Sequence, residues 1–362
     1  MRENPISEGL KPHVDFGANP GALRMLTYIP ANLPAGAPLV VALHGCGQSA
    51  AAYCRGAGWI TLADRLGFAL LAPEQSSSNN FNGCFSWFQQ GDAARGKGEA
   101  ASIAQMTDRA ITDYNLGRSR VFITGFSAGG GMAAVMLAAY PELFAGGAII
   151  AGLAYGAALN MHEALGVMRK PPTHSAHAWG EFVREASTCV GPWPKVSVWQ
   201  GDADRTVGAE NAEAIISQWA DVHGLAAPPT TEDEVDGYPH RVWRDPSGVA
   251  VVEAYTITGM DHGVPIAVDY GDGGCGAAGR FILDVGISST EHIAAFWGLI
   301  AAAAPVRRLK PRPSPVLGSG PILALPKPRV RVAAASTARR AATDLQALIE
   351  GALTTAGVLK RR

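Results

Sequence analysis

The hydrophobic positions of the chain gather in five continuous runs rather than in a strictly alternating pattern. Each run is apolar on what would be both faces of a strand, and each is followed by Gly, Pro or polar residues. Such runs are typical of strands in a parallel sheet that is covered by helices on both sides. The predicted strands lie in residues 38–45, 67–75, 120–127, 195–204 and 249–263.

Helical patterns lie between and after these runs. Apolar residues recur at helical spacing in residues 99–115, residues 128–140 precede a Pro, and residues 208–224 end in a Gly. A fourth predicted helix, residues 288–304, begins with a Ser/Thr cap signal. Because strands and helices alternate, we expect an α/β domain with a doubly wound, mostly parallel sheet over residues 1–304.

The composition changes after Ala304. Residues 305–335 are rich in Pro and basic residues, which predicts an extended linker rather than a helix or a central strand. In residues 336–362 the apolar positions share one helical face and basic residues stand at both ends, so we expect a basic amphipathic helix. The tail from Pro305 holds 12 Lys and Arg against two acids, whereas the preceding 304 residues hold 18 against 29.

The overall composition predicts a folded protein. Hydrophobic residues make up 48% of the 362 residues and charged residues 17%, which is not typical of a disordered chain. The first 16 residues contain no apolar core of a secretory signal, and no apolar segment reaches the roughly 18 residues that cross a bilayer. A cytoplasmic location is therefore the default expectation.

The five cysteines are an odd number and lack the CxxC spacing of a metal site. No metal or other cofactor is expected from them. Without an export signal, five free thiols are the default expectation. If the protein is exported by another route, Cys46 and Cys54 are the best local candidates for a disulfide.

The segment Gly125-Phe126-Ser127-Ala128-Gly129 matches the pattern G-x-S-x-G. A predicted strand precedes Ser127 and a predicted helix follows it. That context is typical of a nucleophile on a sharp strand-to-helix turn, where Gly neighbours relieve crowding. The alternative is a Gly-rich packing turn with no chemical role, but the flanking strand and helix favour the nucleophile.

A serine nucleophile needs a base, and the base needs an orienting carboxylate. In the strand–turn–helix arrangement the order along the chain is Ser, acid, His. Two acids, Asp202 and Asp204, follow the fourth predicted strand, and His262 follows the fifth. Asp261 competes for the acid role, but a side chain one residue from His262 is expected to point elsewhere.

Acyl transfer also needs hydrogen-bond donors for the oxyanion. We expect one donor to be the backbone N–H of Ala128, directly after the nucleophile. The second is expected from the loop after the first predicted strand, His44-Gly45-Cys46-Gly47, where the N–H of Cys46 is the candidate.

Several long motifs in this order resemble the poly(3-hydroxybutyrate) depolymerase family of esterases, in the α/β-hydrolase superfamily. The resemblance covers about residues 20–304 and implies an α/β-hydrolase fold. It rests on the segments VVALHGCGQSA, LLAPEQSSSNNFNGCFSWFQQGDAARGKGEAASI, VFITGFSAGGGMAAVMLAAYPELFAGGAIIAGLAYGAA, WQGDADRTV, GMDHGVP and FILDVGISSTEHIAAFWG.

The resemblance assigns roles to individual residues. It implies that Ser127 is the nucleophile and His262 the general base, and the family pattern G-x-x-D-x-x-V selects Asp204 rather than Asp202 as the acid. It also implies an oxyanion donor at Cys46. Two aromatic residues, Trp87 and Tyr155, are implied to lie near the substrate cleft.

The predicted function is that of a cofactor-free serine carboxyl-ester hydrolase acting on polyhydroxyalkanoate polymer or oligomers. Feruloyl or acetyl-xylan esterase activity is the alternative. A non-catalytic interaction protein that uses the basic tail is a second class. The resemblance suggests an extracellular location as the alternative to the cytoplasm. The tail is expected to bind an anionic or granule surface, with no nucleic acid as partner, and it does not resemble the β-rich substrate-binding module of many polymer depolymerases.

Overall fold

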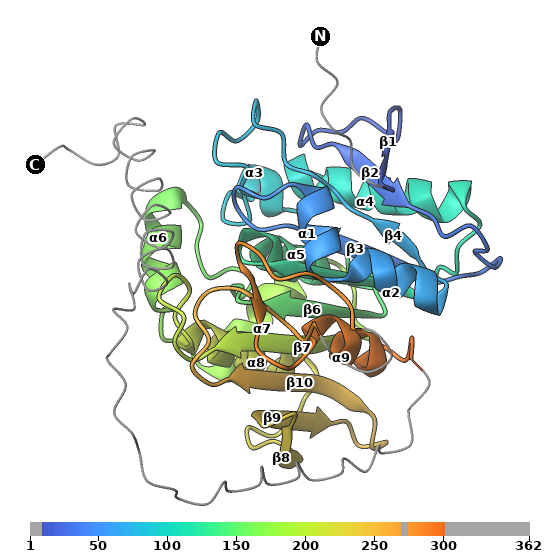
Figure 1. Ribbon diagram of the computed structural model, residues 1–362. Coiled ribbons are helices and arrows are strands. Elements are labelled where there is room, and N and C mark those ends of the chain that lie inside the picture. Colours follow the sequence, from blue (N-terminus) through green and yellow to red (C-terminus); the bar gives the residue numbers. More distant parts are fainter. Residues whose placement is uncertain (1–8, 269–273, 301–362) are drawn as a thin grey trace, which may run out of the picture. The chain divides into compact units, whose positions relative to one another are not determined.

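A mixed sheet of ten strands forms the centre of the computed structural model, which describes residues 9–268 and 274–300 (Figure 1). The strand order is β1-β2-β4-β3-β5-β6-β7-β10-β9-β8. The six central strands β4, β3, β5, β6, β7 and β10 pair with one another in parallel. The strands at the two edges, β1 and β2 on one side and β9 and β8 on the other, pair in antiparallel fashion. The strands are β1 Lys11–His13, β2 Met25–Tyr28, β3 Leu39–Leu43, β4 Ala69–Leu71, β5 Val121–Phe126, β6 Gly146–Ile150, β7 Lys195–Gly201, β8 Thr231–Val235, β9 Tyr238–Arg244 and β10 Ala250–Ile257.

The five predicted strands correspond to β3, β4, β5, β7 and β10, so the expected doubly wound, mostly parallel sheet is confirmed. Side chains of β3 alternate between two cores. Leu39, Val41 and Leu43 belong to one hydrophobic cluster, and Val40 and Ala42 belong to the other. Burial on both faces explains why these runs are continuously apolar.

Helices cover both faces of this sheet. The first cluster contains apolar side chains of α4, α5, α7 and α8, and the second contains those of α1, α2 and α9. Every residue of α5 is buried, because α5 lies between the sheet and other helices. The helices are α1 Ala50–Gly56, α2 Trp59–Leu66, α3 Gln90–Ala93, α4 Gly98–Asp113, α5 Ala128–Ala139, α6 Met161–Arg169, α7 Ala176–Glu185, α8 Glu210–Val222, α9 Ser289–Phe296 and the 3-10 helix η1 Pro141–Leu143.

The last predicted helix is shorter than its apolar pattern suggested. We expected it to span residues 288–304, but α9 ends at Phe296. Gly298 adopts φ 78°, and the N–H groups of Gly298 and Leu299 donate to the carbonyls of Ala295 and Ala294. A left-handed glycine with these reversed bonds terminates a helix, so the apolar pattern continues beyond the helical segment.

The sequence-based prediction missed several strands, among them β6, β8 and β9. β6 is only five residues long and begins with two glycines, which weakens its strand signal. A Cβ on Gly147 would lie 2.4 Å from the Leu137 side chain of α5, so a larger residue there would force that buried side chain to move. The β8–β9 hairpin turns at Asp236 and Gly237, with φ 53° and 88°. An Asp-Gly pair is a recognisable hairpin signal.

A second, small sheet carries part of the chain after β10. Its strands, β11 Val264–Ile266 and β12 Ile282–Asp284, pair in parallel. The predicted linker 305–335 and helix 336–362 lie outside the described residues, so both stay predictions, as does the domain boundary at residue 304. Within 9–268 and 274–300, no helix is long and apolar enough to cross a membrane.

Candidate active site

Ser127 stands on a sharp turn between β5 and α5. Its backbone has φ 56° and ψ −119°, a conformation that L-residues rarely adopt and that costs about 1–3 kcal/mol. A Cβ on Gly125 would lie 2.0 Å from the Gly129 carbonyl oxygen, and one on Gly129 would lie 2.3 Å from that of Leu43. Both glycines of the G-x-S-x-G pattern are therefore required by close backbone approach.

The sheet register brings the predicted site residues to one edge. Gly125 of β5 pairs with Leu43 of β3, and Ile257 of β10 pairs with Gly201 of β7. Loops that follow paired parallel strands emerge at the same end of the sheet. Segments far apart in the sequence thus meet above the carboxyl ends of the strands, where open α/β sheets bind their ligands.

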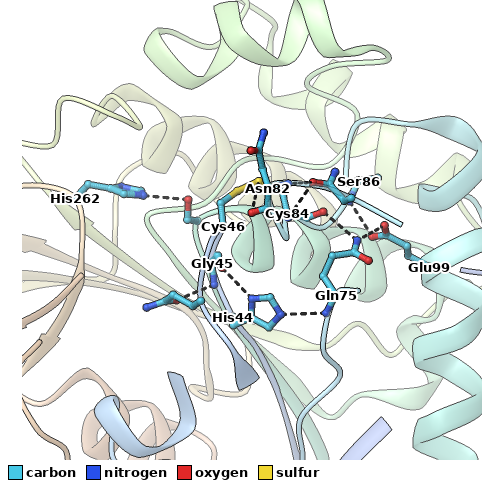
Figure 2. The surroundings of a disulfide bond; sticks show 12 residues. His44, Gly45, Cys46, Gln75, Asn82, Cys84, Ser86, Glu99 and His262 are labelled. Carbon is cyan, nitrogen blue, oxygen red and sulfur yellow. Dashed lines mark hydrogen bonds between the residues drawn. A yellow bond between two sulfur atoms is a disulfide. The ribbon is translucent and has the colours of Figure 1, made fainter. Parts of the chain in front are cut away.

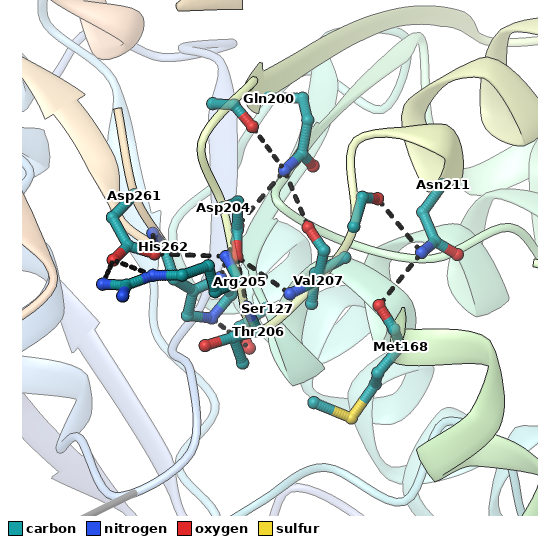
Figure 3. Close-up of polar contacts among 12 residues, drawn as sticks. Ser127, Met168, Gln200, Asp204, Arg205, Thr206, Val207, Asn211, Asp261 and His262 are labelled. Carbon is teal, nitrogen blue, oxygen red and sulfur yellow. Dashed lines mark hydrogen bonds and ion pairs between the residues drawn. The ribbon is translucent and has the colours of Figure 1, made fainter. Parts of the chain in front are cut away.

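A chain of hydrogen bonds connects Ser127, His262 and Asp204 (Figure 3). His262 Nε2 lies 3.0 Å from Ser127 Oγ, and His262 Nδ1 lies 2.7 Å from Asp204 Oδ2. All three residues are at most 8% exposed. Rings of Phe126 and Phe281 flank the imidazole, with centroids 4.8 Å and 5.9 Å away. The imidazole is therefore held in a largely dry environment.

The Asp204 carboxylate is the better anchored of the two candidate acids. Its Oδ1 accepts the N–H groups of Thr206 and Val207, both at 2.8 Å. Its Oδ2 accepts the side-chain amide of Gln200 at 3.1 Å in addition to its contact with His262. These bonds fix the orientation of the carboxylate. Gln200 is a residue of this site that the sequence analysis missed, because nothing in a buried strand position marks such a role.

The neighbouring acids have other partners. Asp202 Oδ1 accepts the N–H of Gly259 at 2.6 Å and so connects the loop after β7 to the loop after β10. Asp261 forms an ion pair with Arg205, 2.5 Å apart, and accepts the N–H of His262. Burial raises the pKa of the Asp261 carboxyl, but the bonds from Arg205 and His262 outweigh burial and lower it. As expected, Asp261 points away from the imidazole.

The two expected oxyanion donors lie on either side of the turn. Ala128 is the first residue of α5, and Cys46 lies in the loop after β3. Neither N–H donates to any acceptor among residues 9–268 and 274–300. A Cβ on Gly45 would lie 2.6 Å from the Phe126 ring, so the loop is tightly packed against the Ser127 turn.

Cys46 forms a disulfide with Cys84, with their Cα atoms 4.3 Å apart (Figure 2). The predicted pairing of Cys46 with Cys54 is therefore wrong, and so is the expectation of five free thiols. Cys54 lies on the inner face of α1 in the second hydrophobic cluster, whereas Cys46 and Cys84 pack against the first. Burial raises the pKa of the Cys54 thiol. Cys54, Cys189 and Cys275 are free.

Trp87 and Tyr155 line a cavity of about 840 Å³ beside the site. None of Ser127, Asp204 and His262 lines this cavity. A Cβ on Gly131 would lie 2.7 Å from the Trp87 indole, and the N–H of Gly131 donates to the Ser127 carbonyl. The cavity therefore begins about one helical turn from Ser127.

The Tyr155 end of the cavity is held by α8. The Gln218 side chain accepts the N–H of Tyr155 at 3.1 Å and donates to its carbonyl at 3.0 Å. Burial raises the pKa of the Tyr155 hydroxyl. Further apolar or aromatic lining comes from Phe88, Ala157, Leu159, Val167 and Phe182, and charged lining from Lys97, Glu163, Lys170 and Glu185.

Comparison with known proteins agrees with this geometry. Residues 24–234 match the model of the family described as Esterase PHB depolymerase. The chain belongs to this family. Poly(3-hydroxyalkanoate) depolymerase C of Paucimonas lemoignei is 45% identical over 287 residues, which are 79% of this chain and 69% of that protein. The family resemblance predicted from the sequence motifs is thereby confirmed.

Proteins that are less similar to this chain are also named as esterases. Feruloyl esterase B of Talaromyces funiculosus is 30% identical over 70% of this chain and 73% of that protein. The structure of an acetyl xylan esterase from Aspergillus awamori superposes with a TM-score of 0.68 at 25% identity, covering 80% of this chain and 99% of the other. The chain is a carboxylic ester hydrolase with the α/β-hydrolase fold, as expected.

The disulfide yields a countable prediction. Alkylation under denaturing, non-reducing conditions should label Cys54, Cys189 and Cys275, and reduction should expose two more thiols. Cys84→Ala should lower the free energy of unfolding by about 2–4 kcal/mol, because the crosslink restricts the unfolded chain. Peptide mass mapping identifies the labelled positions. Labelling of all five cysteines without reduction, in freshly isolated native protein, would contradict the assignment.

Proposed function

We propose that Ser127, His262 and Asp204 form a catalytic triad that hydrolyses carboxyl esters. The observation that supports the proposal most directly is the unbroken chain of hydrogen bonds from Ser127 Oγ through His262 to Asp204. The order of the three residues along the chain is the one that this fold uses. Asp204 accepts the Nδ1–H of His262 and keeps Nε2 free to accept the serine proton.

The first half of the reaction forms an acyl-enzyme. Ser127 Oγ attacks the ester carbonyl carbon while its proton passes to His262 Nε2. The carbonyl oxygen becomes an oxyanion, and the N–H groups of Cys46 and Ala128 donate to it. The C–O bond to the alcohol breaks, and the imidazolium gives its proton to the leaving alcohol oxygen. In the second half, water attacks in the same way and releases the acid and Ser127.

The proposed substrates are polymers or oligomers of a hydroxyalkanoate such as 3-hydroxybutyrate. The relative at 45% identity is named for this activity. The cavity beside Ser127 has the size of a binding site for a chain of several units, and Trp87 and Tyr155 are proposed to contact it. Feruloyl or acetyl-xylan esterase activity is the second candidate, favoured by the relatives with those names.

The Cys46–Cys84 disulfide bears on the location of the protein. Disulfides persist in oxidising compartments, so Cys46–Cys84 supports an extracellular location rather than the cytoplasmic default.

The tail from Pro305 has an excess of ten basic charges. We propose that it binds an anionic or granule surface by electrostatic attraction.

Substitutions at the triad test the mechanism. Ser127→Ala, His262→Ala and Asp204→Asn should each lower kcat for a soluble ester by roughly 10⁴-fold or more, because each removes a member of the proton-transfer chain. Asp202→Asn is the matched control and should have a mild effect, since the Asp202 carboxylate bonds to the N–H of Gly259 rather than to His262. If Asp202→Asn lost most of its kcat and Asp204→Asn kept it, the assignment of Asp204 as the acid would be wrong.

A substrate panel separates the candidate activities. The value of kcat/KM should be higher for 3-hydroxybutyrate trimers and tetramers than for methyl ferulate or acetylated xylosides. Trp87→Ala should raise KM for the oligomers about tenfold, equivalent to about 1.4 kcal/mol of binding. Hydrolysis of p-nitrophenyl acetate, which is too short to extend far from Ser127, is the control. A preference for ferulate or acetyl-sugar esters would favour the second candidate.

Truncation after Ala304 tests the tail. The shortened protein should hydrolyse small soluble esters at nearly the full rate, because every proposed catalytic residue precedes residue 263. Its binding to anionic vesicles should be weaker than that of the full chain at low salt. The difference should vanish at high salt, where the Debye length falls to about 3 Å. Loss of soluble-ester activity or a large fall in Tm would show instead that the tail supports the catalytic domain.

A further inference from the structure

The carboxyl group of Glu99 is buried next to the site but takes no part in the proposed triad. Glu99 lies in the first turn of α4 and is 0% exposed. Its Oε1 accepts the side-chain amide of Gln75 at 2.6 Å, and its Oε2 accepts the N–H of Ser86 at 2.8 Å. No Lys, Arg or His among the described residues forms an ion pair with it. Buried carboxylates are usually paired with a cation, so its retention calls for another explanation.

Both donors belong to residues 75–87, which also contain Cys84 of the disulfide (Figure 2). Ser86 directly precedes Trp87, whose indole packs on the first turns of α5. The Gln75 amide also donates to the carbonyl of Cys84 at 3.0 Å, and the Gln75 N–H donates to His44 Nε2 at 3.1 Å. The network therefore reaches the loop that contains Cys46 by two routes, through His44 and through the disulfide.

We propose that Glu99 is a positioning residue for ester hydrolysis at Ser127. Its carboxylate holds residues 84–87 directly through the Ser86 N–H and indirectly through Gln75, which bonds to the Cys84 carbonyl, and thereby keeps the Cys46 N–H and the Trp87 indole in their working positions. This inference rests on the proposed function. It adds a residue outside the triad and the oxyanion donors, and that residue acts only through Gln75 and Ser86.

The ionised form of Glu99 is the form that matches its surroundings. Both oxygens accept hydrogen bonds, and the groups that donate to them, the Gln75 amide and the Ser86 backbone N–H, cannot accept a carboxyl proton. The pKa of Glu99 is raised to about 7, mainly by burial and also by the charge of Asp92 on α3, although the bonds from Ser86 and Gln75 act to lower it. Burial lowers the pKa of the neighbouring His44, which therefore stays neutral near pH 7.

Protonation of Glu99 sets the direction in which the rate should change with pH. As the pH falls through about 7, Glu99 takes up a proton and one of its two accepted bonds is weakened. The wild-type rate should therefore fall as the pH decreases through about 7.

The isosteric variant Glu99→Gln tests the proposal. The readout is the rate at which a p-nitrophenyl phosphonate labels Ser127, measured from pH 5 to 9, together with kcat and KM for a short soluble ester. We expect Glu99→Gln to lower the labelling rate and kcat about tenfold, less than the 10²–10³-fold cost of deleting an oxyanion donor. Its rate should fall less steeply than that of the wild type as the pH decreases through about 7.

A matched control separates positioning from simple support of the fold. Glu253→Gln makes the same change at a buried glutamate of β10 that bonds to Ser197 and His240, away from Ser127. It should keep the wild-type rate and the wild-type pH profile. If Glu99→Gln lowers only Tm and retains the wild-type kcat, KM and pH profile at a temperature where it is folded, the proposal is overturned.

A second variant decides the matter if Glu99→Gln does not fold. Gln75→Met removes one donor to the Glu99 carboxylate, which disfavours the charged form, so the acidic side of the profile should move to higher pH. An unmoved profile would overturn the proposal. Failure of the proposed function looks different, because the wild-type protein itself would then show no phosphonate on the peptide that contains Ser127.

Discussion

The close approach of α5 to the ends of β3 and β5 governs the architecture of the site. The Cβ positions of Gly125 and Gly129 would collide with backbone oxygens at 2.0 Å and 2.3 Å, so the turn exists only because both residues lack a side chain. This approach forces Ser127 into φ 56° and raises its hydroxyl above the strand ends. It also places the N-terminus of α5, with its positive end of the helix dipole, beside the loop of Cys46.

Three acids near His262 have separate tasks because their partners differ. Asp204 accepts hydrogen bonds from two backbone N–H groups and from the Gln200 amide, and its Oδ2 also contacts the Nδ1 of His262. Asp202 bridges two loops and Asp261 pairs with Arg205. The chemistry of a carboxylate is the same in all three cases. What distinguishes them is the set of donors that fixes each orientation, and these donors lie on β7 and in the loops after β7 and β10.

The disulfide and the Glu99 network stabilise the same part of the molecule from two sides. Cys84 attaches its segment covalently to the loop after β3, and Glu99 attaches the same segment to α4 by hydrogen bonds. The segment between β4 and α3, which contains no helix or strand, is thus attached to the rest of the domain at fixed points. Loops that border active sites commonly depend on such attachments to a rigid scaffold.

The sequence alone determined the strand-and-helix alternation, the turn at Ser127 and the order Ser, acid, His. These features are local, because continuous apolar runs and Gly positions report burial and close approach directly. The choice of Asp204 over Asp202 came only from family resemblance. Tertiary structure decided the partners of Cys46 and Glu99 and the end of α9. Disulfide partners 38 residues apart and donors from separate loops are brought together by the sheet, and no spacing along the chain encodes that proximity.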